Sequence, residues 1–191
     1  DLWEVDAYAQ DFANYSDAIC DASTDLTVVF GNVAIDKQSI GQDGRLRKYN
    51  GVYVCSNGAY IARPEVPPGL PQGIQPKTLQ PNYRFFDDDR HFFSLRQLAE
   101  ETGQSPFDWI HPYCVSLRDG RFFRFGVQLC EDMWCQDYRH NGEVLDTLKI
   151  FKARRAEAVF NLSASPWTWQ KNDKRNRVVR EILSDSPLPF F

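Results

Sequence analysis

Apolar side chains near the start of the chain follow a helical spacing and then give way to β-prone runs. The helical set predicts an amphipathic helix over residues 8–22 and consists of Tyr8, Phe12, Tyr15, Ala18 and Ile19. Residues 26–35 have the apolar, β-branched character of a strand, and residues 51–61 predict one or two more. Because Ser56-Asn57-Gly58 is a turn signal inside that second run, we expect a hairpin there.

A stretch rich in proline and glycine follows at residues 64–81. Such a composition cannot hold regular structure for long, so it predicts a loop at the surface or at a site. The loop contains Lys77, whose side chain is a candidate for chemistry.

The second half of the chain alternates between strands and helices. In order, we expect strands at 113–117 and 122–130, a helix at 144–156, a strand at 158–162 and a helix at 173–183. The step Asp119-Gly120 is a tight-turn signal that would join the first two strands. Strands that alternate with helices around apolar segments predict an α/β layer fold.

Composition and charge narrow the class of protein. With 191 residues, 42% of them hydrophobic, the chain can bury the core of one globular domain or most of one. A net charge of -4 lacks the basic excess expected of a nucleic-acid binder. Charges interrupt every apolar run well short of a membrane span, and the first residues show no secretory signal.

The cysteines favour reduced thiols in a cytoplasmic protein, because five is an odd number and their spacing matches no disulfide framework. Cys130 differs from the other cysteines, because it ends an apolar run and is followed directly by Glu131 and Asp132. A strand fixes the position of a residue at its end and the following turn exposes it, so Cys130 is a candidate nucleophile. The alternative is that Cys130 is a small buried hydrophobe, as most free cysteines are.

Three motifs occur in a fixed order. They are Lys-Thr-Leu-Gln-Pro-Asn-Tyr at 77–83, Val-Gln-Leu-Cys-Glu-Asp-Met-Trp at 127–134 and Asn-Leu-Ser-Ala-Ser-Pro at 161–166. Together they resemble the signatures of nitrilase-like carbon–nitrogen hydrolases, and they are most similar to the glutamine-hydrolysing (glutaminase) domains of glutamine-dependent NAD synthetases. The resemblance covers nearly the whole chain and implies an α/β/β/α sandwich that associates into homo-oligomers.

The resemblance also implies a role for individual residues. Cys130 would attack the side-chain amide of L-glutamine to form a thioester, and Lys77 would stabilise the oxyanion. Asp88 falls where relatives carry a glutamate, a second acid that positions the lysine and the attacked carbonyl, and its side chain is one methylene shorter. The positions implied in substrate binding are Tyr83, Glu131, Ser165 and Lys171.

Several of these residues have an ordinary structural alternative. Lys77 could be a solvated surface lysine, and Asp88 could belong to a solvated acidic turn. Tyr83 could be a core tyrosine, and Ser165 could simply initiate a turn before Pro166.

The resemblance places the general base, a glutamate, upstream of residue 1, because Asp1-Leu2 is similar to the end of that segment. Glu4 follows this step and is not a substitute. We therefore expect residues 1–191 to be one hydrolase domain portion that lacks the first strand and helix and the C-terminal strands, and to be impaired in activity alone. A separate C-terminal synthetase domain would use ATP and deamido-NAD, and no cofactor or metal is expected within residues 1–191.

Other functions stay open. The chain could be a carbon–nitrogen hydrolase for another amide or nitrile, or a non-catalytic domain that keeps the fold. A cysteine–histidine hydrolase is less favoured, because no spacing selects among His91, His111 and His140. A zinc site made from Cys130, Cys135 and His140 lacks a second ligand pair, and the acidic run 87–89 lacks the glycine and terminal glutamate of a calcium loop.

Overall fold

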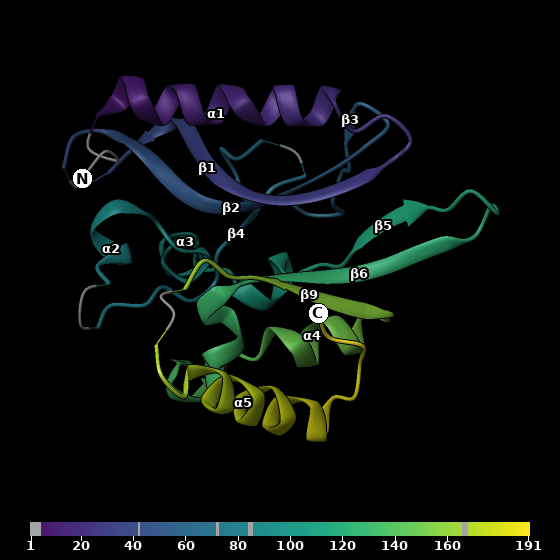
Figure 1. The fold of residues 1–191 in the computed structure, drawn as a ribbon. Coiled ribbons are helices and arrows are strands. Elements are labelled where there is room, and N and C mark those ends of the chain that lie inside the picture. Colours follow the sequence, from purple (N-terminus) through teal and green to yellow (C-terminus); the bar gives the residue numbers. More distant parts are fainter. Residues whose placement is uncertain (1–4, 42, 72, 84–85, 166–167) are drawn as a thin grey trace. The chain divides into compact units, whose positions relative to one another are not determined.

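The computed structural model describes residues 5–41, 43–71, 73–83, 86–165 and 168–191 (Figure 1). The chain divides into two compact units, Asp1–Trp109 and Ile110–Phe191, and each is described by itself. Several residues named above lie outside the described part of the chain: Asp1, Leu2, Glu4 and Pro166. Within the described residues, no helix is long and apolar enough to cross a membrane.

The first unit opens with a helix and an antiparallel sheet, as predicted. Helix α1 (Asp6–Asp21) precedes strands β1 (Thr27–Ile40) and β2 (Leu46–Ser56), which pair from Thr27 opposite Ser56 to Asp36 opposite Arg47. The expected hairpin turn leads into β3 (Ala59–Tyr60), and β4 (Gln75–Pro76) also pairs with β2. Strand β1 continues five residues past the predicted end and β2 begins five residues before the predicted start, because Asp36 pairs with Arg47 and Ile40 with Leu46 across a register shift.

Helix α1 lies along this sheet (Figure 1). The Asn32 side chain on β1 donates one hydrogen bond to Ser16 Oγ at 2.8 Å and another to the Phe12 carbonyl at 2.6 Å. At the far end of the helix, Tyr60 Oη donates to Asp17 Oδ1 at 2.8 Å. The apolar interior of the sheet includes the fully buried Val52, Val54 and Cys55.

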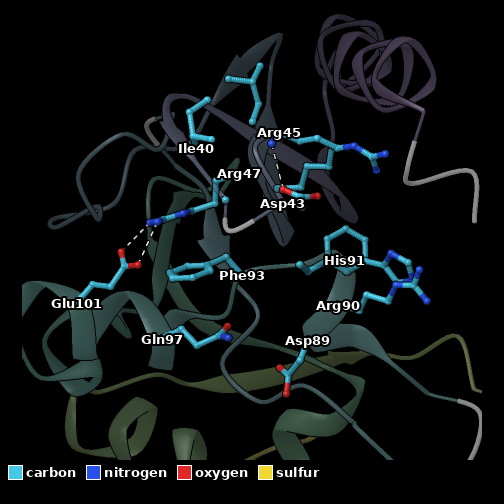
Figure 2. Close-up of a pocket in the computed structure, with 14 residues that line it drawn as sticks. Ile40, Asp43, Arg45, Arg47, Asp89, Arg90, His91, Phe93, Gln97 and Glu101 are labelled. Carbon is cyan, nitrogen blue, oxygen red and sulfur yellow. Dashed lines mark hydrogen bonds and ion pairs between the residues drawn. The ribbon is translucent and has the colours of Figure 1, made fainter.

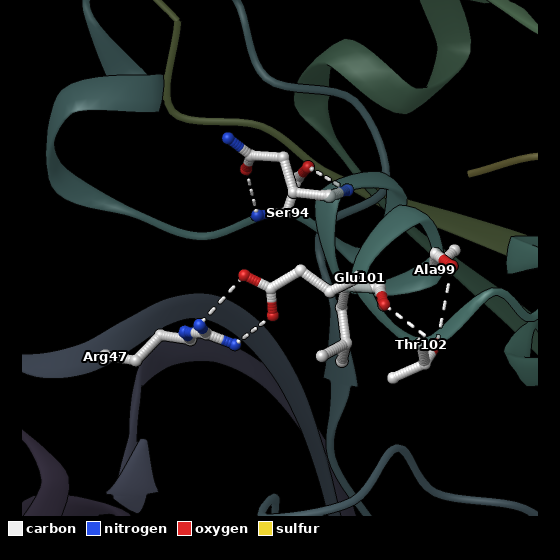
Figure 3. A network of polar contacts seen from close by, with 7 residues as sticks. Arg47, Ser94, Ala99, Glu101 and Thr102 are labelled. Carbon is white, nitrogen blue, oxygen red and sulfur yellow. Dashed lines mark hydrogen bonds and ion pairs between the residues drawn. The ribbon is translucent and has the colours of Figure 1, made fainter. Parts of the chain in front are cut away.

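The predicted loop at 64–81 is irregular apart from β4, yet residues 73–81 are buried rather than exposed. It leads to short helices that the sequence patterns did not predict: α2 (Asp88–His91), α3 (Leu95–Thr102) and the 3₁₀ helix η2 (Pro106–Trp109). Ser94 caps the start of α3 (Figure 3), where it forms a capping box with Gln97. Gly103 ends the helix in the left-handed conformation.

The second unit is built on three strands. Strand β5 (Tyr113–Ser116) pairs antiparallel with β6 (Phe122–Leu129), and β9 (Ala158–Leu162) pairs parallel with β6. After β6 come the 3₁₀ helix η3 (Cys130–Asp137) and the two-residue strands β7 (Arg139–His140) and β8 (Glu143–Val144). Phe190 forms a parallel bridge with Val159, so chain-terminal residues extend the sheet at β9.

Two helices complete the second unit. Helix α4 (Thr147–Ala153) is shorter than the predicted helix over 144–156, because Val144 pairs in the small β7–β8 hairpin and Asp146 caps the helix start. Helix α5 (Lys171–Asp185) contains the predicted helix over 173–183. Strands, helices and their alternation confirm the α/β class expected from the sequence.

Candidate active site

Cys130 follows directly on the last residue of β6 and begins η3. Its φ of 44° lies in the left-handed region, which a side chain with a Cβ rarely adopts. Such strain is maintained only where the surroundings enforce it, and it is concentrated at functional sites. Cys130 is partly exposed, whereas Cys20, Cys55 and Cys135 are buried, so the buried-hydrophobe alternative fits those three thiols better.

Ser165 lies next to the Cys130 thiol. The Sγ and Oγ atoms are 3.2 Å apart, and either can donate the hydrogen bond. Ser165 comes three residues after β9, which is the parallel neighbour of β6. Because neighbouring parallel strands end at the same edge of a sheet, the two motifs that carry Cys130 and Ser165 meet there.

A chain of polar side chains connects the ends of β6 and β9. Ser163 Oγ donates to Asn161 Oδ1 at 2.5 Å. Asn161 Nδ2 lies 3.4 Å from Gln128 Oε1 and 3.5 Å from the Cys130 carbonyl oxygen. Gln128 Nε2 in turn donates to Thr147 Oγ1 at 2.7 Å, which ties the strand to the start of α4. The backbone around Cys130 is therefore tethered to both neighbouring elements.

The two acids after Cys130 are both buried and both hydrogen-bonded. Asp132 Oδ2 accepts from the Leu129 N–H at 2.9 Å, and Glu131 Oε1 accepts from Tyr138 Oη at 2.8 Å. A buried carboxylate needs such partners because desolvation without them is costly. Tyr138 was not a sequence candidate, and no spacing in the chain marks it as the partner of Glu131.

Lys171 is the first residue of α5 and is half-buried. Its backbone N–H donates to the Thr168 carbonyl at 3.1 Å. One turn further on, the Lys174 ammonium lies 5.2 Å from the centroid of the Trp134 ring on η3, within range of a cation–π contact. The start of α5 is thus held against the helix that Cys130 begins.

In the first unit, Lys77 is buried, with 4% of its surface exposed. Its backbone is held on both sides, because its N–H donates to the Asn50 carbonyl at 2.7 Å and its carbonyl accepts from the Leu95 N–H at 3.1 Å. The ammonium meets Asp88 Oδ2 at 2.7 Å. These contacts exclude the alternative of a solvated surface lysine, since a buried ammonium is stable only with a partner.

Asp88 is the first residue of α2, and its shorter side chain still reaches Lys77. The solvated acidic turn is therefore wrong for Asp88. Burial raises the pKa of the neighbouring Asp89 carboxyl, Arg96 opposes this, and the negative charges of Asp88 and Asp87 add to it. Of these three acids, Asp88 is the one paired with the lysine.

Tyr83 is 48% exposed, so it is not a core residue. Its ring meets the ring of Phe86 edge-on, with centroids 5.6 Å apart. An exposed phenol on an aromatic support can present both a flat face and a hydroxyl to a ligand. The exposure of the Tyr83 ring excludes the alternative of a core tyrosine, and its binding role stays a prediction.

The first unit also has a cavity of about 710 Å³, between the β1–β2 connection and helices α2 and α3 (Figure 2). Arg47 forms a fork with Glu101, at 2.8 and 3.1 Å, on one side of it and lies 3.9 Å above the Phe93 ring (Figures 2 and 3). Charges of both signs line the cavity, and none of the predicted site residues is among them. We therefore assign the candidate chemistry to the Cys130 and Lys77 segments rather than to this cavity.

The predicted residues thus form two groups, one in each unit. The first unit brings Lys77 and Asp88 together and carries Tyr83, and the second brings Cys130 and Ser165 together and carries Glu131 and Lys171. Within the described ranges, no three His, Cys, Asp or Glu side chains gather in a way that could hold a metal ion. The sequence did not predict two contacts of the neighbouring residues, that of Asp132 with the Leu129 N–H and that of Tyr138 with Glu131.

Solved structures with a similar fold come from carbon–nitrogen hydrolases and related synthetases. The glutamine-dependent NAD+ synthetase of Acinetobacter baumannii matches with a TM-score of 0.59 and 21% identity over 93% of this chain and 26% of its own. A carbon–nitrogen hydrolase from Helicobacter pylori G27 matches with a TM-score of 0.61 and 14% identity over 99% of this chain and 52% of its own. An amidase from Nesterenkonia sp. AN1 matches with a TM-score of 0.54 and 13% identity over 99% and 54%.

No protein-family model and no curated protein matches the chain. The chain spans about a quarter of the length of the synthetase and about half of the length of the hydrolase and the amidase. At these identities the likeness establishes the fold, which is that of the nitrilase-like carbon–nitrogen hydrolases.

Proposed function

We propose that this chain hydrolyses a carboxamide, with Cys130 as the nucleophile. The observation that carries the proposal is the position of Cys130, a partly exposed thiol in a left-handed backbone at the end of β6, with Sγ 3.2 Å from Ser165 Oγ. The fold shared with carbon–nitrogen hydrolases supports the same reaction class. Backbone strain is concentrated at functional sites, so the left-handed conformation of Cys130 supports a chemical role for this residue.

In the proposed reaction, Cys130 Sγ attacks the amide carbonyl carbon and the C–N bond breaks. The general base takes the thiol proton and passes it to the leaving nitrogen, so ammonia leaves and a thioester remains. Water then cleaves the thioester, which yields the carboxylic acid and the free thiol. The negative oxygen of each tetrahedral intermediate requires a donor, and Lys77 is the buried cation that we assign to it, with the backbone N–H of Glu131 as a second donor.

For this role Lys77 needs a fixed position and a countercharge for its buried ammonium. The Asp88 carboxylate at 2.7 Å supplies both, because it compensates the burial of the ammonium and limits its freedom. A cation held in this way needs little reorganisation when the oxyanion forms. Asp88 therefore acts in the proposal as the acid that positions Lys77.

We propose L-glutamine as the amide. The similarity to the glutamine-dependent NAD+ synthetase supports this choice, as does the sequence resemblance in the three motifs. Tyr83 and Lys171 would contact the amino-acid end of glutamine. The Lys171 ammonium would bind the α-carboxylate of the substrate. Glu131 and Ser165 complete the predicted substrate contacts. The released ammonia would pass to a C-terminal synthetase domain that uses ATP to convert deamido-NAD to NAD, in a homo-oligomer.

A different amide is the second candidate, favoured by the hydrolase and amidase among the similar structures. The Nesterenkonia amidase is described with acrylamide added to its active site cysteine. A small aliphatic amide has no α-carboxylate, so the Lys171 ammonium would add nothing to its binding. Competition between L-glutamine and propionamide as substrates separates the two candidates.

The test uses the full-length natural protein and follows ammonia release from L-glutamine and from propionamide. We expect glutamine to be the better substrate, and Cys130→Ala to abolish release. Cys114→Ala is the matched control, because Cys114 is an exposed thiol on β5. Ammonia release that persists in Cys130→Ala would exclude the nucleophile, whereas ammonia release by the natural protein from propionamide but not from glutamine would select the second candidate.

A further inference from the structure

The left-handed backbone at Cys130 needs a restraint, because a residue with a Cβ would otherwise relax to φ below zero. The backbone groups on the two sides of the strained residue each contact a polar side chain. On one side is the N–H of Leu129, and on the other is the carbonyl of Cys130 itself. The first of these makes the shorter and better buried contact, since Asp132 Oδ2 accepts from Leu129 N–H at 2.9 Å.

Asp132 lies in the first turn of η3, three residues after Leu129, and its carboxylate reaches back to the main chain before the helix. This is the acidic half of a capping box, in which the side chain at the third helical position accepts from the residue that precedes the helix. The bond closes a ring that contains Cys130. Rotation of Cys130 out of the left-handed region would pull the Leu129 N–H away from the carboxylate.

Burial makes this restraint strong. Asp132 is 1% exposed, so a lost hydrogen bond at its carboxylate cannot be replaced by water. Charge-assisted bonds of a carboxylate to a backbone N–H are also stronger than neutral ones. By comparison, the contact on the carbonyl side, Asn161 Nδ2 to Cys130 O, is long at 3.5 Å.

We infer that Asp132 is a positioning residue for the nucleophile, which holds Cys130 in its left-handed conformation through the Leu129 N–H. This inference rests on the proposed function and deepens it. In it, Asp132 does not touch the substrate but places Cys130 Sγ for the attack. Glu131 is not the residue in question, since its carboxylate is bound by Tyr138.

The inference predicts a specific pattern of variants in the full-length protein. Asp132→Ala removes the acceptor and should lower kcat about 100-fold with little change in KM, because the thiol is displaced while the substrate contacts stay. Asp132→Asn keeps an acceptor oxygen at the same position and should restore kcat to within about fivefold of the natural protein. Asp137→Ala, an exposed acid on the same helix, is the matched control and should leave kcat unchanged.

Hydrogen exchange at the Leu129 amide gives a readout that needs no activity. In the natural protein and in Asp132→Asn this amide should be as protected as its neighbours in β6, and in Asp132→Ala it should exchange faster. Full kcat in Asp132→Ala, an Asp132→Asn variant as slow as Asp132→Ala, or rapid Leu129 exchange in the natural protein would each overturn the inference. If Asp132→Ala does not fold, the natural protein and Asp132→Asn still decide it.

Failure of the proposed function has a different signature. In that case Cys130→Ala keeps its amidase activity, while the Leu129 exchange pattern still reports whether Asp132 holds the backbone. The two conclusions can therefore fail separately.

Discussion

Gly126 on β6 is a site where a single added methyl group should disturb the strand that carries the nucleophile. A Cβ built at Gly126 would lie 2.3, 2.4 and 2.8 Å from the Cδ2, Cγ and Cδ1 atoms of Phe151. Carbon atoms at optimal separation are about 3.5–4.0 Å apart, so the ring would have to retreat by about 1.2 Å or more. Phe151 on α4 is fully buried, so its ring can retreat only by displacing other core atoms.

The expected cost of Gly126→Ala follows from this overlap. Overpacking of a well-filled core costs about 1–3 kcal/mol. For a domain of this size, each 1 kcal/mol lowers the melting temperature by about 2–4 °C, which gives a decrease between about 2 and about 12 °C. Because Cys130 lies four residues further along the chain, we also expect kcat to fall.

A double-mutant cycle tests the cause rather than only the size of the effect. Phe151→Leu makes room by removing ring atoms, so Gly126→Ala should cost less in that background than in the natural protein. The assay is thermal unfolding of all four proteins, followed by circular dichroism, with amidase activity measured on each. An unchanged melting temperature in Gly126→Ala, or costs that simply add in the double variant, would refute the argument that the ring and the new methyl collide.

Three further outcomes are expected. Lys77→Met should lower kcat/KM about 10²–10³-fold by removing the oxyanion cation, whereas Lys37→Met, at an exposed position on β1, should not. Burial raises the pKa of the Cys135 thiol to about 12 and that of the Cys55 thiol to about 12. The stability that these two neutral thiols contribute is therefore complete below pH 9 and is lost as the pH rises towards 12. Melting temperatures should therefore fall above pH 9, and less so in Cys135→Ala. Iodoacetamide at pH 8 should modify the exposed Cys114 before either buried thiol, which peptide mass spectrometry will show.

The sequence predicted those elements whose pattern is strong over many residues. Helix α1, β5, β6 and β9 lie close to where periodicity and turn signals placed them, and so does the turn between β2 and β3, whereas β1 ends five residues later and β2 begins five residues earlier than predicted. Helix α3 was missed although its capping box of Ser94 and Gln97 and the following Gly103 are local signals that could have identified it. The helix predicted over 144–156 began too early, because the pairing of Val144 across the β7–β8 hairpin depends on a tertiary contact.

The candidate site divides in the same way. Cys130 and Ser165 were proposed from motifs, and their contact follows from the parallel pairing of β6 and β9. The Lys77–Asp88 pair spans eleven residues of irregular chain, so no periodicity could have predicted that the ammonium and the carboxylate meet. Tyr138 and Gly126 were not singled out either, since a phenol partner for a buried acid and a close approach of a helix to a strand are features of packing.

The shorter acid at position 88 shows why motif positions must be interpreted together with the backbone. Loss of one methylene left open whether Asp88 could take the place of the glutamate, and in the structure Asp88 Oδ2 lies 2.7 Å from Lys77 Nζ. Main-chain bonds hold both ends of the pair, from Lys77 N–H to Asn50 O at 2.7 Å and from Asp88 N–H to Pro81 O at 3.3 Å. Because the backbone sets the separation, a longer glutamate would have to bend back or push the ammonium aside. At the backbone separation found in this chain, the shorter acid is therefore the one that fits Lys77.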